Sequence, residues 1–247
     1  MRLTASRLFA LALVAAVVGF PTETPAQSMR DAKICDNTAS PPVEIIRACS
    51  LFLRSKRFPN GNRLPNNVIA ANYVRRASAY SRIYEFDRAI EDYSAALEIS
   101  PTPADVLSSR GFSYAAAGND DLALADFEAS LRINPKQAFS LQGRGSVYLR
   151  RMDYDRALAD FNQSIAINPK LAWTYNGRAN VFYVKGDNAR GDADIQKALQ
   201  LEPASRAAFE ETADFTKHWL QYLREIQNDR DYANWSRPPF EAYTSAR

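Results

Sequence analysis

Apolar and small residues recur at helical spacing through the middle of the chain. Leu107, Gly111 and Tyr114 form one such stripe, with about one member per helical turn on a single face. Turn-forming residues occupy positions 118–120, and a second stripe follows them: Ala123, Phe127 and Ser130. The pattern predicts short antiparallel helices in pairs.

This helix-pair pattern repeats every 34 residues, as four prolines show: Pro101, Pro135, Pro169 and Pro203. Counting back from them gives four units, which cover residues 70–103, 104–137, 138–171 and 172–205. Small residues recur at one matching place (Ala77, Gly111, Gly145, Ala179) and mostly aromatic residues at another (Tyr93, Phe127, Phe161, Ile195). Proline cannot continue a helix and restricts the residue before it, so each period ends a helix pair.

On these residues the chain resembles tetratricopeptide repeat (TPR) proteins. The resemblance implies an all-α fold, a right-handed superhelix of four helix-turn-helix repeats with capping helices at both ends. One helix pair cannot bury its own apolar faces, so neighbouring pairs stack and leave a concave groove. The resemblance also implies that the first helix of each repeat lines this groove and that the protein is an interaction scaffold.

Segments outside the repeats are predicted to cap the stack. Residues 42–53 have an amphipathic helical pattern and belong to an N-terminal cap and loop, residues 27–69. Residues 206–228 are predicted to form a C-terminal capping helix. The aromatic tail, residues 229–247, either packs along the repeats or is mobile.

The first 26 residues have the layout of a cleavable signal peptide. Arg2 and Arg7 precede an uninterrupted apolar run of 13 residues, Leu8 to Phe20, and small residues at 24 and 26 offer a cleavage site after Ala26. The alternative is a membrane anchor, but the run is shorter than the ~20 residues that span a bilayer. We therefore expect no stable membrane insertion and a periplasmic or secreted protein, typical of a Gram-negative bacterium.

Export favours a disulfide between Cys35 and Cys49, the two cysteines of the chain. The alternative is a redox pair, which usually needs the closer C-x-x-C spacing. Residues 34–49 resemble the cysteine-pair entry of some exported alphaproteobacterial TPR proteins.

Arginine and aspartate also follow the 34-residue period. Arginine recurs at Arg76, Arg110, Arg144 and Arg178, and aspartate recurs in step at Asp92, Asp126, Asp160 and Asp194. Because one charge of each sign occurs per repeat, the pattern favours ion pairs that lock helices together. The alternative is an arginine ladder for an anionic ligand.

The composition excludes several kinds of site. With one histidine, His218, and two cysteines, the chain cannot build a four-ligand Cys/His zinc cage, and we expect no metal and no cofactor. A net charge of +3 is too small to indicate nucleic acid. Residues 27–67 hold seven basic against three acidic residues, with a cluster at Arg54, Lys56 and Arg57 that we interpret as a solvated loop rather than a binding patch.

The resemblance places partner contacts on the first helices, and the later repeats carry aromatic and amide residues there. We expect the partner to contact Phe139, Arg150, Trp173, Asn176, Asn180 and Tyr183. For Phe139 the alternative is packing between helices. The predicted function is a scaffold or adaptor that binds a peptide segment of another protein in its concave groove.

Two other functions are weaker alternatives. The chain could be a structural envelope protein that associates with itself as a homo-oligomer. A hydrolase is less favoured because the adjacent carboxylates Asp120-Asp121 and Glu210-Glu211 do not face each other across a substrate. We therefore expect no catalytic residues and no enzyme activity.

Overall fold

The computed structural model describes residues 25–58, 60–99 and 103–228, and these residues are almost all helical. The described residues contain no strand, only an isolated antiparallel bridge between Arg57 and Arg63. The prediction of an all-α fold is confirmed. Residues 1–24 of the predicted signal peptide and the tail at 229–247 lie outside the described residues.

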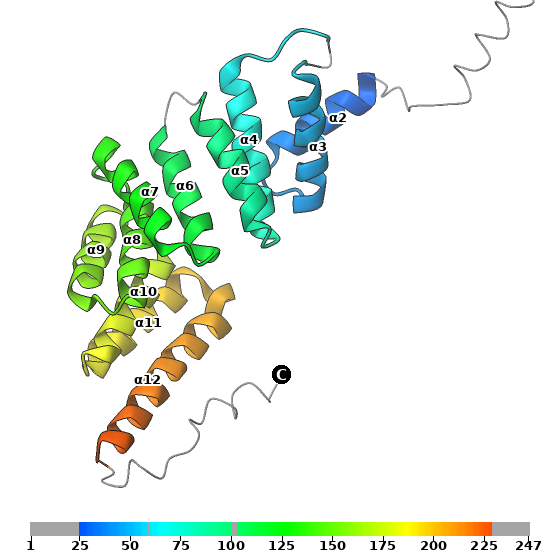
Figure 1. Cartoon of the computed structure of the whole chain (residues 1–247). Coiled ribbons are helices and arrows are strands. Elements are labelled where there is room, and N and C mark those ends of the chain that lie inside the picture. The colour runs from blue at the N-terminus through cyan, green and yellow to red at the C-terminus, as the bar shows by residue number, and fades with distance from the viewer. Residues whose placement is uncertain (1–24, 59, 100–102, 229–247) are drawn as a thin grey trace, which may run out of the picture. The chain divides into compact units, whose positions relative to one another are not determined.

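The chain forms two compact units, one ending at Ser113 and the other beginning at Tyr114. The first unit contains α2 (Pro25–Asp36), α3 (Pro42–Ser55), α4 (Asn66–Arg82) and α5 (Phe86–Leu97), and α6 (Pro103–Ala116) crosses the boundary. The second contains α7 (Asp120–Ile133), α8 (Ala138–Arg150), α9 (Tyr154–Ile167), α10 (Ala172–Val184), α11 (Asn188–Leu201), the 3₁₀ turn Pro203–Ser205 and α12 (Arg206–Asn228). Figure 1 shows α4 beside α5, and α8 beside α9.

The core of the first unit forms around the disulfide between Cys35 and Cys49, which confirms the predicted pairing. It joins α2 to α3, and both cysteines are buried with Ile45 and Leu64. The sequence analysis did not predict α2, which begins at Pro25, inside the predicted signal peptide. Its inner face includes the buried Asp31, whose Oδ1 accepts a hydrogen bond from Nη2 of Arg47 at 2.8 Å.

The turns inside the helix pairs place one residue in the left-handed region at each period. These residues are Tyr84 (φ 63°), Gly118 (φ 82°), Met152 (φ 60°) and Gly186 (φ 80°). The backbone N–H three positions beyond the helix end then reaches back to a carbonyl of the last turn, as that of Asp153 reaches Tyr148 at 2.9 Å. The turn conformation therefore follows the 34-residue period even where the residue is not glycine.

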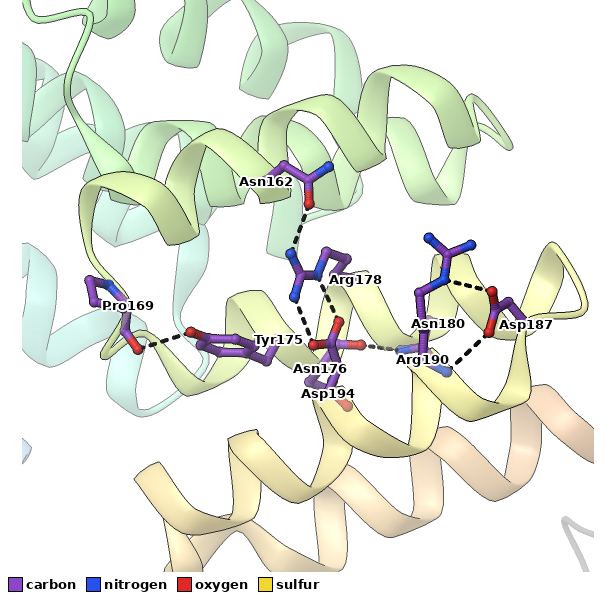
Figure 2. Close-up of polar contacts among 9 residues, drawn as sticks. All are labelled: Asn162, Pro169, Tyr175, Asn176, Arg178, Asn180, Asp187, Arg190 and Asp194. Carbon is purple, nitrogen blue, oxygen red and sulfur yellow. Dashed lines mark hydrogen bonds and ion pairs between the residues drawn. The ribbon is translucent and has the colours of Figure 1, made fainter.

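Three of the expected Arg–Asp pairs lie within one unit, and each forms between the two helices of one pair. The guanidinium of Arg178 donates through Nε and Nη2 to Asp194 at 2.7 and 2.8 Å, as Figure 2 shows. Arg76 binds Asp92 in the same way at 2.7 Å through both nitrogens, and Arg144 binds Asp160 at 2.8 Å. The three carboxylates are buried. These hydrogen bonds raise the pKa of Arg76, Arg144 and Arg178 above its usual value.

The remaining nitrogen of the arginine reaches the preceding helix. Nη1 of Arg178 donates to Asn162 of α9, and Nη1 of Arg76 donates to Ser50 of α3, both at 2.8 Å. Arg110 binds Ser94 of α5 at 2.9 Å in the same manner. Arg110 belongs to the first unit, whereas Asp126, its expected partner, belongs to the second. Because each unit is described by itself, this pair stays a prediction.

We predict that Arg144→Ala destabilises the protein because it leaves Asp160 buried without its cation. The expected cost is about 2–3 kcal/mol, or a melting temperature lower by roughly 5–10 °C. Thermal unfolding followed by circular dichroism measures the change, with Arg156→Ala as the control because Arg156 is exposed. An unchanged melting temperature for Arg144→Ala would contradict the architectural role and favour the ligand ladder.

Candidate partner-binding surface

Two aromatic side chains remain open to solvent at matching places in the second unit. Phe139 and Trp173 are each the second residue of a first helix, α8 and α10, and they are 51% and 44% exposed. These two helices pack against each other. The edge of the Trp173 ring contacts the buried Phe209 of α12, with ring centroids 4.8 Å apart. Phe139 and Trp173 therefore expose aromatic rings at equivalent places on two packed helices, and we call them the aromatic pair.

A lysine precedes each member of the aromatic pair by three residues. Lys136 and Lys170 are exposed in the turns that lead into α8 and α10. In each turn the backbone N–H of the lysine donates to Oδ1 of an asparagine at 3.1 Å. Neither lysine forms an ion pair with a described residue. The surface thus combines aromatic rings with uncompensated positive charge.

Arg150, another predicted contact, is already held by an ion pair with Asp120 of α7. Two similar pairs join residues 30 apart, Arg151 to Asp121 at 2.6 Å and Lys185 to Asp155 at 2.7 Å. Each joins the end of one first helix to the start of the preceding second helix. Arg150 is half exposed, but it ends α8 whereas Phe139 lies near the start of that helix, so Arg150 serves the helix packing and is not part of the aromatic pair.

The expectation that Asn176, Asn180 and Tyr183 line an open groove is wrong, because α12 covers them. All three are buried, and Tyr183 has no exposed surface. The amide of Asn180 accepts a hydrogen bond from Thr216 of α12 at 2.9 Å and donates to the carbonyl of Asn176 at 3.1 Å, the latter shown in Figure 2. Oδ1 of Asn176 is buried and finds no hydrogen-bond partner among the described residues.

The hydroxyl of Tyr183 donates to Asp192 at 2.9 Å. The ammonium of Lys217 on α12 lies 4.6 Å from the centre of the Tyr183 ring and donates to the same carboxylate at 2.6 Å. Burial, reinforced by the nearby carboxylate, raises the pKa of Tyr183. The hydrogen bond from Lys217 lowers the pKa of Asp192. Tyr183 is therefore part of the packing between α10, α11 and α12.

Two signals in the sequence indicate this burial. Phe209 and Ala213 lie 34 residues after Tyr175 and Ala179, and all four are buried in one core. Thus α12 takes the place of the first helix of a further repeat. Gly191 stands where the other repeats have alanine, and a Cβ there would lie 2.3 Å from Cε1 of Tyr183. The missing methyl group makes room for the ring.

The fold and one repeat match known proteins. Residues 70–103 match the family model described as tetratricopeptide repeat. These residues therefore form a tetratricopeptide repeat. A crystal structure of MamA protein is similar over 72% of this chain and 93% of that chain, with 20% identity and a TM-score of 0.53. MamA residues 41 to the end from Desulfovibrio magneticus RS-1 are similar over 73% of this chain and 96% of that chain, with 16% identity and a TM-score of 0.55.

At these identities the two likenesses concern the fold alone. No curated protein matches the chain in sequence. Repeat folds of this kind serve as interaction scaffolds, which agrees with the coarse functional expectation. Within the described ranges no three His, Cys, Asp or Glu residues lie where they could hold a metal ion, and no helix has the length and apolar character to cross a membrane.

We predict that Gly191→Ala destabilises the protein by about 1–3 kcal/mol, because the added methyl group overlaps the buried Tyr183 ring. Thermal unfolding followed by circular dichroism tests this. Tyr183→Phe is the matched background, since it removes the hydroxyl but keeps the ring, and Gly191→Ala should remain destabilising there. If Gly191→Ala leaves the melting temperature unchanged both in the wild-type protein and in Tyr183→Phe, the Tyr183 ring is not packed against Gly191.

Proposed function

We propose that this protein is an exported scaffold that binds a peptide segment of a partner protein over the aromatic pair. The observation that carries the proposal is the exposure of Phe139 and Trp173 at the same place on two packed helices. Burying the exposed half of each ring would contribute about 2 kcal/mol. Aromatic anchors of this kind supply much of the affinity at interfaces.

The charges beside the aromatic pair indicate the chemistry of the segment. Lys136 and Lys170 form no ion pair with a described residue, and each lies just before the positive end of a helix dipole. A segment with two apolar side chains and at least one carboxylate complements this arrangement. The buried amides of Asn176 and Asn180 lie outside the surface proposed here.

Export to the periplasm or beyond is part of the proposal. The basic start, the apolar run and the small residues before Ala26 support it, as does the buried disulfide. Expression of the full chain with mass spectrometry of the product tests it. We expect a protein that begins at Gln27 and is recovered from the periplasmic or extracellular fraction, whereas an intact leader in the cytoplasmic fraction would contradict export.

We predict that replacing the aromatic pair abolishes partner capture. Wild-type protein, Phe139→Ala/Trp173→Ala and the single variant Phe139→Glu are used to capture proteins from envelope extract, and capture by either variant should fall at least about tenfold. Phe139→Glu matters because Trp173 also supports Phe209, so the double variant loses some packing. Circular dichroism checks that each variant is folded.

The matched control is Leu122→Ala/Ile133→Ala, which removes two exposed apolar side chains from α7 and should leave capture unchanged. Equal capture by the wild-type protein and Phe139→Glu would contradict the proposed surface. No captured protein together with a dimeric mass by light scattering would instead support self-association.

A further inference from the structure

A short hairpin connects α3 to α4 (Figure 1), and its sequence contains several cations. Arg57 and Arg63 are paired in the antiparallel bridge. The flanking hydrogen bonds run from Phe58 N to Asn62 O at 2.7 Å and from Leu64 N to Lys56 O at 2.9 Å. This arrangement makes Arg57 and Arg63 a non-hydrogen-bonded pair, whose side chains project closely spaced from the same face. We call Arg54, Lys56, Arg57 and Arg63 the basic hairpin.

The backbone holds the basic hairpin in a fixed position on the first unit. Leu64 is buried in the core that contains the disulfide, so its neighbour Arg63 projects to the opposite face. Lys56 ends α3 in the left-handed conformation, and its N–H donates to the carbonyl of Phe52 at 2.7 Å. Arg57 donates through Nη1 to the carbonyl of Gly61 at 2.6 Å. All four basic side chains are exposed.

No carboxylate neutralises these four cations within the described residues. The sequence has no Asp or Glu between Glu44 and Glu85. Other arginines of this stretch reach carboxylates on other segments, as Arg47 reaches Asp31 and Arg75 reaches Asp36. The cations of the basic hairpin form no such pair.

Helix stability explains only half of the basic hairpin. Arg54 and Lys56 lie at the C-terminus of α3, where a positive charge favours the helix dipole. Arg57 and Arg63 gain nothing there, and like charges directly opposite in a bridge destabilise it. The solvated-loop interpretation of this cluster therefore leaves the arginine pair unexplained.

We propose that the basic hairpin docks the protein on an anionic phospholipid surface. The four cations stand at a connection between helices, and a hairpin tip is far smaller than the interface that a specific protein partner requires. A phospholipid surface requires only a local density of positive charge, and each cation strengthens such binding independently.

The test measures co-sedimentation of the full mature chain with vesicles. Phosphatidylcholine vesicles containing phosphatidylglycerol should bind the protein, and pure phosphatidylcholine vesicles should not. Arg57→Ser/Arg63→Ser should weaken binding about 25-fold, since each cation near an anionic surface is worth about fivefold in affinity. Raising the salt concentration should release the wild-type protein.

Two further variants keep the outcome interpretable. Arg57→Lys/Arg63→Lys loses the bond to Gly61 but keeps both charges, so it should bind as the wild type does. Arg132→Ser/Lys197→Ser removes two exposed cations elsewhere and should also leave binding unchanged. Circular dichroism confirms that each variant is folded.

Three results would overturn the proposal. One is equal binding to neutral and anionic vesicles, and another is equal loss for the Arg57/Arg63 and Arg132/Lys197 variants. The third is that soluble polyglutamate or duplex DNA binds the basic hairpin while anionic vesicles do not, which would assign it to an acidic polymer.

Discussion

The architecture depends on an arginine that recurs in each repeat, and Arg178 shows how it holds three helices together. In α10, Arg178 binds Asp194 of α11 through two nitrogens and Asn162 of α9 through the third. The rings of Tyr175 and Phe182 lie 5.6 Å from its guanidinium carbon. A stacked helix pair cannot bury its apolar faces alone, so a contact that fixes both its own partner and the preceding helix sets the register of the stack. Each of the three guanidinium nitrogens donates a directed hydrogen bond, which makes the geometry specific.

Close backbone approach is the second constraint, and the two act together. A Cβ on Gly177 would lie 2.6 Å from the buried ring of Phe161, so the helix α10 can approach α9 only because that position is glycine. The same approach brings Arg178, the next residue, within reach of Asn162. Local composition and long-range ion pairing thus specify the same packing, and this agreement between levels is what a well-defined native state requires.

The features that follow the 34-residue period could be predicted from the sequence, and those that depend on the ends could not. The helix pairs, the turns and the Arg–Asp pairs repeat, so each copy supports the prediction for the others. Whether Asn176, Asn180 and Tyr183 are buried depends instead on α12. This helix occurs once, and it lacks the arginine that recurs in the repeats. The position of α12 is indicated by Phe209 and Ala213 when the period is continued beyond Pro203. The unusual Gly191 is a second indication. Helix α2 was missed because its inward face holds the polar Asp31 beside Cys35 rather than an apolar stripe.

Departures from the period are therefore the better indicators of function. Where the last two repeats have Phe139 and Trp173, the first two have Ala71 and Asp105, so the fold itself does not require an aromatic ring there. The cations near the helix ends of the second unit, such as Arg151 and Lys185, meet carboxylates of the preceding helix. Those of the basic hairpin, outside the repeats, meet none within the described residues. Side chains shared by all the repeats are explained by packing. Exposed aromatic rings and uncompensated charges at positions where the repeats differ cost stability or solubility and need an explanation from binding. The aromatic pair and the basic hairpin share no residue and belong to different units, so each can be removed without altering the contacts that hold the other.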